Sequence, residues 1–358
     1  MAQELHGCEA GATYDVLVAG GGPAGAVSAL CLARLGWRVV LLEAGTDGTA
    51  GYGETLPPES NPLLRTLGLW DAFQRSAPLE SPGIVSRWGQ SFPSQQDFLC
   101  NPYGSGWHVD RARFDAGLRA EASRAGVTVL RGAHVKTLAR RDGWWLWNGA
   151  RARFVVDAAG RNGLRLGAAA GREIDDNLLV LVLRMAHPEG RPADLRTQIV
   201  AVPSGWWYWS PVPGGSSVAM FFTCLAEYRR ARLLAPADCA QAAPVIGALV
   251  RSAPIPEARW ISVSSSLRTS LRGDAWVAVG DSASSYDPLS GRGIFKAIRH
   301  ASLAAQALDA SLRGGPDAFA AYEARVRGEY RDYRKQRKAY YALEQRWQSN
   351  PFWAGRQK

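Results

Sequence analysis

Residues 14–43 read YDVLVAGGGPAGAVSALCLARLGWRVVLLE, and this stretch decides the fold. Its apolar run before Gly20 predicts a short buried strand, and the run that ends on Glu43 predicts a second one. Between them the helical spacing of apolar residues, stopped by Gly36, predicts a helix. Strand, glycine turn, helix, strand and acid in this order predict a site for a dinucleotide.

Each glycine of the G-x-G-x-x-G pattern has a separate task. Gly20 permits the turn out of the strand, Gly22 lets a pyrophosphate approach the backbone, and Gly25 lets the helix pack closely. The helix that begins at Pro23 and Ala24 offers unpaired N–H groups to the phosphates. Glu43 is expected to accept hydrogen bonds from the ribose hydroxyls. This half of the site does not distinguish FAD from NAD.

A second motif lies some 260 residues after the first. Residues 274–293 read DAWVAVGDSASSYDPLSGRG and are followed by an amphipathic helical pattern. Asp281 follows a predicted strand, and Gly291 and Gly293 bracket the loop before the helix. An acid at a strand end, a glycine loop and a helix N-terminus predict a second site for hydroxyls and anions.

The second motif resembles the G-D segment of flavoprotein hydroxylases related to p-hydroxybenzoate hydroxylase, and of flavin-dependent halogenases. The resemblance implies FAD as the cofactor. It implies that Asp281 holds the ribityl chain, that Pro288 lies near the flavin ring, and that Gly291, Gly293 and Ile294 face the flavin pyrimidine. Two further segments resemble this family: residues 109–115, in which Arg111 is expected to contact FAD, and residues 154–161. In the latter, Asp157 and Gly160 are expected beside the dinucleotide, with a plain turn as the alternative for Asp157.

Other segments point to the halogenase side of the family. The GETLPP run that contains Glu54 resembles a segment beside the flavin, so Glu54, Pro288 and Arg87 are the candidate catalytic residues. Residues 205–211 resemble the halogenase signature G-W-x-W-x-I-P, with Tyr208 in place of the second Trp and Ser210 in place of the Ile. The candidate substrate contacts are Trp206, Trp207, Tyr208 and Trp209. Arg87 stands where halogenases need a Lys, and a guanidinium does not readily form a haloamine.

These departures favour oxygenation over halogenation. The combination, including the aromatic run from Tyr340 to Trp353, resembles the flavoprotein maturases of quinone-cofactor enzymes (the LodB, GoxB and QhpG type). It implies a monooxygenase that hydroxylates an electron-rich indole through a flavin C4a-hydroperoxide, with a Trp in a peptide or protein as one substrate. The alternatives are a hydroxylase or halogenase-like enzyme on a small natural product, an isoprenoid-type FAD reductase, and a non-enzymatic escort protein. Reducing equivalents are expected from NAD(P)H directly or from a separate flavin reductase.

Composition excludes several other classes. The 358 residues carry a net charge of +10, but no nucleic-acid motif accompanies it. Much of this charge lies in a run from Arg325 to Lys338, which is predicted as the solvated face of a helix. There is no apolar stretch of about 18 residues, so no membrane span is expected. The five cysteines and five histidines show no metal-binding spacing, and the odd cysteine count fits a reducing cytoplasm.

The predicted architecture is an α/β fold with two interleaved parts. A Rossmann-like FAD-binding domain of the p-hydroxybenzoate hydroxylase (glutathione-reductase-like) type is expected over residues 14–75, 107–170 and 265–345. A substrate domain built on a mostly antiparallel sheet is expected over residues 76–106 and 171–264, with strands near 178–185, 198–202, 206–210 and 218–224. Residues 1–13 are expected to be a disordered lead-in.

Overall fold

The computed structural model describes most of the chain. The described residues are 11–46, 53–90, 92–166, 171–186, 194–232, 239–241, 243–252, 255, 257–315 and 317–356. Residues 1–10 of the expected lead-in lie outside this part. Thr13 is the first residue of strand β1, so this residue does not belong to a disordered lead-in.

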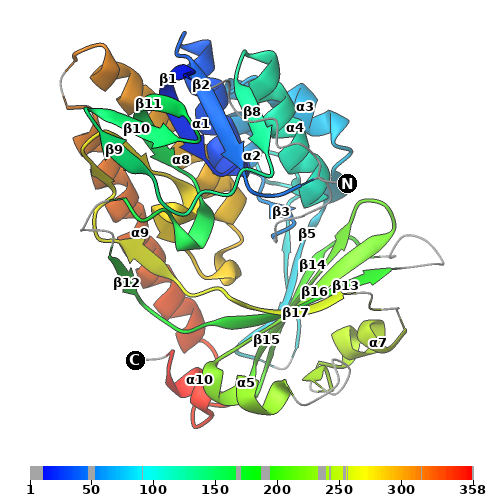
Figure 1. Ribbon diagram of the computed structural model, residues 1–358. Helices are drawn as coiled ribbons and strands as arrows, with labels where there is room; N and C mark the ends of the chain where they lie inside the picture. Colours follow the sequence, from blue (N-terminus) through cyan, green and yellow to red (C-terminus); the bar gives the residue numbers. More distant parts are fainter. Residues whose placement is uncertain are drawn as a thin grey trace, which may run out of the picture.

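The first sheet contains the strand–helix–strand unit with which the sequence opens (Figure 1). Its path runs β19 (Arg272–Gly273), β20 (Trp276–Ala278), β11 (Ala150–Asp157), β1 (Thr13–Ala19), β2 (Val39–Glu43) and β8 (Thr128–Arg131), and β10 (Trp144–Trp147) and β9 (Ala139–Arg141) extend it beside β11. The five strands from β20 to β8 are parallel. The inner strands are almost wholly apolar because helices and a small hairpin cover both faces of such a sheet.

Helices complete this part of the fold. They are α1 (Pro23–Arg34), α2 (Ser60–Thr66), α3 (Trp70–Arg75), α4 (Arg111–Arg124) and α8 (Gly293–Leu312). Helices α1 and α8 lie side by side, although 270 residues separate their first residues, Pro23 and Gly293. This packing brings the two glycine motifs of the sequence to the same end of the sheet.

The second large sheet is mostly antiparallel. Its order is β17 (Glu257–Ser262), β13 (Leu179–Ala186), β16 (Ser216–Thr223), β15 (Gly205–Val212), β14 (Thr197–Val202), β5 (Gly83–Arg87) and β6 (Ser94–Asp97). Only the pair β14–β5 is parallel. The four strands expected in this region are present within three residues of their predicted ends. The predicted fold class, with one parallel and one mostly antiparallel sheet, is confirmed.

The second sheet is covered on both faces, as its alternating apolar residues require. One face packs under α7 (Pro244–Ser252) and buries Trp207, Trp209 and Phe221. The other face turns toward the first part of the fold and the C-terminal segment, and it buries Trp206 and Phe222. This second face is the one from which a side chain can reach the glycine loops.

Two small sheets lie at the junction of the large ones. The first has the order β3 (Thr55–Leu56), β7 (Gly106–His108), β4 (Leu79–Ser81), and the second has the order β12 (Arg172–Ile174), β18 (Ser266–Arg268), β21 (Ser284–Ser285). Strand β3 follows Glu54, so the small sheet fixes the segment that carries the candidate acid. Short 3₁₀ turns occupy Gly160–Asn162 (η1), Gly280–Ser282 (η2) and Pro288–Ser290 (η3).

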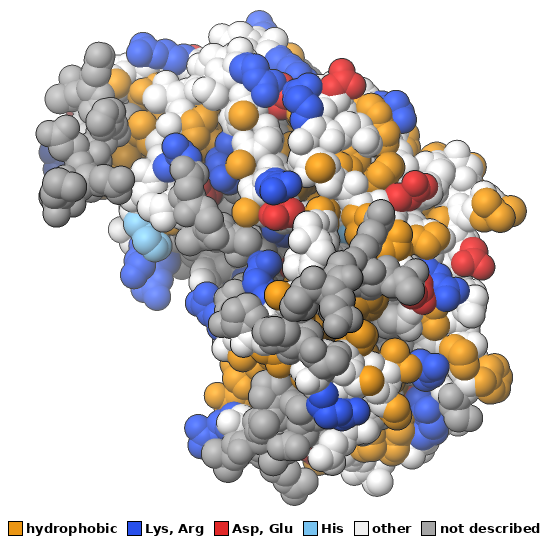
Figure 2. All heavy atoms as spheres, turned by 90° about the vertical axis from the view of Figure 1, so that its right-hand side faces the viewer, with side chains coloured by type: hydrophobic (Ala, Val, Ile, Leu, Met, Phe, Trp, Pro, Cys, Tyr) orange, Lys and Arg blue, Asp and Glu red, His pale blue; other side chains and the backbone are white. Residues whose placement is uncertain are grey.

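The long helix α9 (Phe319–Ala342) runs along both parts of the molecule and leads to α10 (Pro351–Ala354), while α5 (Leu225–Ala231) lies beside α10 (Figure 1). Arg331, Lys335 and Lys338 are exposed on α9, as the charge run predicted. On the face in Figure 2, hydrophobic side chains appear in small groups among basic and acidic ones. None of the helices in the described part of the chain is long and apolar enough to cross a bilayer.

The first sheet draws its strands from residues 13–157 and 272–278, and the second from residues 83–97 and 179–262. This distribution is compatible with two interleaved parts. The domain limits given above, 14–75, 107–170 and 265–345 against 76–106 and 171–264, stay a proposal.

Candidate functional site

The turn between β1 and α1 has room only for glycine at two of its three motif positions. Gly20 has φ +105°, and a Cβ there would lie 2.3 Å from the carbonyl oxygen of Ala158. A Cβ at Gly25 would lie 1.7 Å from the carbonyl oxygen of Gly20. At Gly22 a Cβ would meet nothing within 4 Å, so open space lies next to the start of α1. No side chain caps this helix, and its first N–H groups are available to an anion.

Glu43 closes this turn from the end of β2. Its carboxylate accepts hydrogen bonds from the backbone N–H of Gly21, at 2.5 Å, and of Gly45, at 2.6 Å. Arg119 donates to the carbonyl oxygen of Gly21 at 3.0 Å. An acid is therefore held at the carboxyl end of β2, beside the glycine turn, as the dinucleotide pattern requires.

The second motif packs directly on the first. Gly280 has φ +58°, and a Cβ there would come within 2.7 Å of the Cβ of Ala24 in α1. Asp281 follows and forms ion pairs with Lys296, at 2.8 Å, and with Arg161, at 3.4 Å. Burial raises the pKa of Asp281, but these two cations outweigh it and lower the pKa to about 2. The Asp281 carboxylate is thus a stable hydrogen-bond acceptor.

The loop after Asp281 ends in a second open helix N-terminus. Gly291 has φ +60°, and a Cβ at Gly291 or Gly293 would meet nothing within 4 Å. Helix α8 begins at Gly293 without a side-chain cap, and Ile294 is buried in its first turn. Pro288 begins the 3₁₀ turn that precedes this loop. Two uncapped helix ends and three open glycine positions therefore fit a ligand with phosphate groups and a polar ring.

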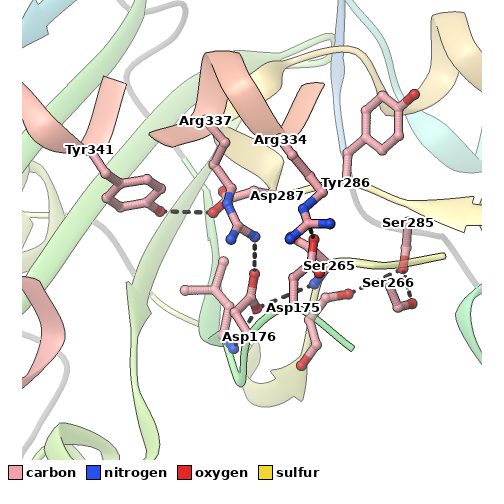
Figure 3. A network of polar contacts seen from close by, with 12 residues as sticks. Asp175, Asp176, Ser265, Ser266, Ser285, Tyr286, Asp287, Arg334, Arg337 and Tyr341 are labelled. Atoms are coloured by element: carbon pink, nitrogen blue, oxygen red, sulfur yellow. Dashed lines mark hydrogen bonds and ion pairs between the residues drawn. The ribbon is translucent and has the colours of Figure 1, made fainter. Parts of the chain in front are cut away.

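Helix α9 holds the loop of residues 287–293 in place (Figure 3). The buried carboxylate of Asp287 accepts hydrogen bonds from the backbone N–H of Leu289, at 2.9 Å, and from the Tyr341 hydroxyl, at 2.8 Å. The backbone N–H of Asp287 donates to the Tyr333 hydroxyl at 2.7 Å. The Asp287 side chain caps the 3₁₀ turn η3 and not helix α8.

Glu54 is a buried acid next to this loop and to β3. Its side chain is 1% exposed, and within the described residues neither carboxylate oxygen has a hydrogen-bond partner. Burial raises the pKa of Glu54 to about 7, although the Arg111 and Arg184 guanidinium groups lower it. Arg111 itself pairs with Asp115 at 3.0 Å and donates to the carbonyl oxygen of Gly53 at 3.1 Å. The carboxyl group of Glu54 can therefore gain or lose a proton near neutral pH.

Asp157 does not lie open to a ligand. It is fully buried, its carboxylate pairs with Arg268 at 2.5 Å, and it accepts a hydrogen bond from the Leu164 N–H at 2.8 Å. Its carboxylate already accepts hydrogen bonds from groups of the protein itself. This corrects the expectation that Asp157 contacts the dinucleotide. Gly160 has φ +72° with nothing within 4 Å of a Cβ, so this neighbouring turn does have open space.

A cavity of about 390 Å³ lies between the glycine loop and the second sheet. Its walls come from four places: the segment from Thr55 to Glu59, the loop from Asp287 to Arg292, the second sheet with the residues that follow β6, and helix α9. The sheet contributes Ile84, Ser86 and Ile199, and α9 contributes Tyr333, Arg337 and Tyr340. This volume is within the usual range for small-molecule pockets. Another hollow, of about 520 Å³, lies between residues 174–177, α5 and α10, and it contains none of the predicted site residues.

The aromatic strand β15 contributes less to this cavity than expected. Trp207 and Trp209 lie on the other face of the sheet, under α7, because side chains alternate along a strand. Trp206 is on the inner face, but it is 1% exposed, stacks on Phe222 and donates to the Tyr341 hydroxyl. This corrects the substrate role expected for the three tryptophans. Tyr208 is on the inner face and its hydroxyl bonds to Thr55, which lines the cavity.

Arg87 also lies on the far face of the sheet. It pairs in register with Val200, which packs on the α7 side, whereas Ser86 and Trp88 line the cavity. The Arg87 side chain therefore cannot contact a substrate in this cavity. This corrects the catalytic role that was expected for Arg87. The physical reason is again the two-residue period of a strand.

Several site residues were not predicted from the sequence. Lys296 lies one turn into α8, and a lysine so close to the Asp281 motif was a signal that could have been used. Tyr333 and Tyr341 are far along the chain from Asp287, and no local pattern indicates their contact. Thr55 and Ser210 were visible only as parts of motifs.

The chain was compared with known proteins. It matches the family described as tryptophan halogenase over residues 15–80 and 79–358. LodB of Marinomonas mediterranea, named as an FAD-dependent oxidoreductase, is 29% identical over 96% of this chain and 97% of its own length. The myxobacterial chondrochloren halogenase CndH superposes with a TM-score of 0.86 at 26% identity, covering 97% of this chain and 86% of that one. The peptidyl tryptophan dihydroxylase QhpG superposes with a TM-score of 0.76 at 26% identity, covering 97% and 79%.

Proposed function

Because the chain belongs to the tryptophan halogenase family, we propose that it is an FAD-dependent monooxygenase that hydroxylates a tryptophan side chain within a peptide or protein. The family and these relatives confirm that the protein is an FAD-dependent oxidoreductase. This excludes the alternative of an escort protein without redox chemistry. The finer claim of hydroxylation rests on the cavity and on its lining residues.

The glycine motifs fit FAD. We assign the pyrophosphate to the turn at Gly20, Gly22 and Gly25, with Pro23 and Ala24 in the first turn of α1, because open space and free N–H groups meet there. The other assigned cofactor contacts are Glu43, Arg111, Gly160, Asp281, Pro288, Gly291, Gly293 and Ile294. When bound and reduced, the flavin supplies activated dioxygen.

The cavity of about 390 Å³ is the observation that carries the proposal. It opens beside Gly291, where the flavin ring is expected, and it is walled by Thr55, Ile84 and Ile199. Among the described residues that line it there is no lysine, so it offers no amine to take up a halogen. The protein's task here is to hold an aromatic ring in one orientation and to exclude water.

Glu54 is the proposed acid–base group. Hydroxylation of an indole ring carbon requires that a proton leave that carbon, and a carboxyl group with a pKa of about 7 can accept a proton near neutral pH. Glu54 lies directly before Thr55, which lines the cavity. Its buried oxygens have no hydrogen-bond partner in the described part of the chain. Glu54 itself does not line the cavity, so the proposed role has the proton reach it through a relay and not directly from the ring.

The description of one relative, QhpG, supports the proposed substrate class. QhpG is described as a peptidyl tryptophan dihydroxylase essential for tryptophylquinone cofactor biogenesis, and LodB as an FAD-dependent oxidoreductase. We therefore propose a protein-bound tryptophan as the substrate, and NAD(P)H or a separate flavin reductase as the source of electrons.

The test is the mass of the product. The FAD-loaded protein is supplied with NADPH and a flavin reductase, dioxygen, bromide and a tryptophan-containing peptide. The proposal predicts a peptide that gains one or two oxygen atoms at the tryptophan and no bromine. A brominated peptide, or free tryptophan modified while peptides are not, would contradict it.

Halogenation is the second candidate because the superposition on CndH has the high TM-score of 0.86. The same incubation separates the two, since bromide is present throughout. A bromine in place of hydrogen on the indole would establish this second candidate.

A further inference from the structure

Strand β6 (Ser94–Asp97) forms one edge of the second sheet. It pairs with β5 on one side, and no strand in the described part of the chain pairs with its other side. All four of its residues are exposed. The unpaired N–H and C=O groups of an edge strand can form hydrogen bonds with another extended chain. The free side of β6 is therefore a candidate binding surface.

The register of β6 shows which of its backbone groups point to the free side. The Phe98 N–H, directly after the strand, donates to the Pro82 carbonyl oxygen at 2.9 Å. In an antiparallel ladder such hydrogen-bonded pairs alternate with pairs whose backbone groups point away from the partner strand. The N–H and C=O groups of Gln95 and Asp97 therefore point away from β5. Among the described residues these groups have no hydrogen-bond partner.

The same strand forms part of the cavity wall. Gln96, which is opposite Ile84 of β5, lines the cavity of about 390 Å³, and so does Phe98. Side chains that are opposite each other on adjacent strands lie on the same face of the sheet. If a further strand paired with β6, every second side chain of that strand would lie on the face that carries the cavity. A residue opposite Gln96 would have its side chain next to the cavity.

Exposed apolar side chains lie near both ends of β6. Phe92 precedes the strand and is 64% exposed, and Leu99 follows it and is 93% exposed. Tyr103, in the loop after the strand, is 50% exposed. These side chains fall within residues 92–103 and offer apolar contacts to a chain that binds at this edge.

We propose that β6 is the docking strand for the peptide substrate, which adds an extended segment to this edge and places its tryptophan side chain in the cavity. The inference rests on the proposed function, because that function makes a tryptophan within a peptide the substrate. Backbone pairing at a sheet edge gives affinity, and a pocket beside it gives specificity for one side chain. Free tryptophan has no flanking peptide groups to pair with Gln95 and Asp97, so it binds more weakly than a peptide.

The first test uses a fluorescently labelled peptide of nine residues, with tryptophan at its centre among threonine and serine. Its binding to the FAD-loaded, oxidised protein is measured by fluorescence anisotropy. One derivative carries N-methyl groups at the tryptophan and two residues to either side, and the other at the two residues next to the tryptophan. Because successive N–H groups of a strand point to opposite sides, only one derivative loses its bonds to β6. We expect that derivative to bind about tenfold more weakly than the parent peptide, as the loss of two hydrogen bonds implies, and the other to bind like the parent.

The second test removes one outward N–H group from β6 itself. Gln95→Pro does so, and proline is tolerated in an edge strand where its nitrogen faces solvent. Gln95→Ala is the matched control, because it loses the same side-chain contact with Arg196 and keeps the N–H group. We expect Gln95→Pro to bind the parent peptide about 3- to 10-fold more weakly than Gln95→Ala. If Gln95→Pro does not fold and retain FAD, the methylated peptides decide the question on the wild-type protein.

The inference would be overturned if the parent peptide does not bind, if both methylated peptides bind equally, or if the two folded variants bind equally. A wild-type dimer that Gln95→Pro dissociates would also overturn it, because β6 would then pair with a second copy of the chain. The proposed function fails separately, if the peptide binds with the expected alternation but gains no oxygen at its tryptophan.

Discussion

Glu54 is a buried acid at the candidate site whose carboxylate oxygens have no hydrogen-bond partner among the described residues. Such a group survives in a folded protein by remaining protonated, which is why its pKa is raised to about 7. The burial that raises the pKa of Glu54 should therefore also lower the free energy of unfolding when the pH rises and the carboxyl group loses its proton.

Glu54→Gln tests this at the level of one residue. The raised pKa means that the folded state binds the proton of Glu54 more tightly than the unfolded state does. The contribution of Glu54 to the free energy of unfolding is therefore fully present below about pH 4.5 and declines as the pH rises to about 7. The decline should amount to about 3 kcal/mol. In urea unfolding from pH 4.5 to 8, the free energy of wild type relative to that of Glu54→Gln should fall by this amount, whereas groups such as His108 that both proteins share cancel in the difference. The two proteins should agree near pH 4.5, and curves that run parallel at all pH values would contradict the assigned environment.

At the scale of elements, α9 acts as a clamp on the loop of residues 287–293. Tyr333 and Tyr341 hold Asp287 from the helix. Arg337 of the same helix reaches Asp176 at 2.6 Å (Figure 3). Tyr341 also accepts a hydrogen bond from Trp206 of the second sheet. One helix thus connects the loop before α8 with the sheet that walls the cavity.

Tyr341→Phe should weaken this clamp. It leaves Oδ2 of Asp287 and the Trp206 N–H without their partner in the interior, which should cost about 1–3 kcal/mol in the free energy of unfolding. FAD affinity should fall as well, because Asp287 fixes the loop. Tyr340→Phe is the matched control, since Tyr340 is exposed on the same helix. Equal unfolding curves for the two variants would refute the clamp.

The elements themselves were largely predictable, and the orientation of single side chains was not. Residues 14–43 contain local signals for a strand, a turn and a helix, and the Asp281 loop contains another set. Trp207, Trp209 and Arg87 were misjudged because a motif read as one block ignores the alternation of a strand. The expected contact of Asp157 with the dinucleotide was wrong because its ion-pair partner, Arg268, is over 100 residues away in the sequence. No local pattern indicates this pair.

At the scale of the whole molecule, two segments some 260 residues apart form one site. Gly280 touches Ala24, so the Asp281 motif and the first glycine turn share one packing contact. This contact places the open ends of α1 and α8 on the same side of the parallel sheet. Ligands of such sheets bind at the carboxyl ends of the strands, which is where both motifs lie.

Gly280→Ala should separate the two motifs. Its φ of +58° already disfavours a side chain, and the added Cβ would press on Ala24 at 2.7 Å. We expect FAD affinity to fall at least tenfold, because both halves of the dinucleotide site move apart. Gly36→Ala is the control, with a similar positive φ of +94° but nothing within 4 Å. Equal FAD dissociation constants, measured by flavin fluorescence, would show that the contact is not required.

The central claim is that the bound flavin of this protein transfers oxygen from dioxygen to a protein-bound tryptophan. It is tested most directly by mass spectrometry of a tryptophan-containing peptide after turnover under isotopically heavy dioxygen. The account predicts that every oxygen gained by the indole is the heavy isotope, and that Glu54→Gln lowers the yield. Light oxygen drawn from water, a halogen on the ring, or an unmodified peptide would contradict it.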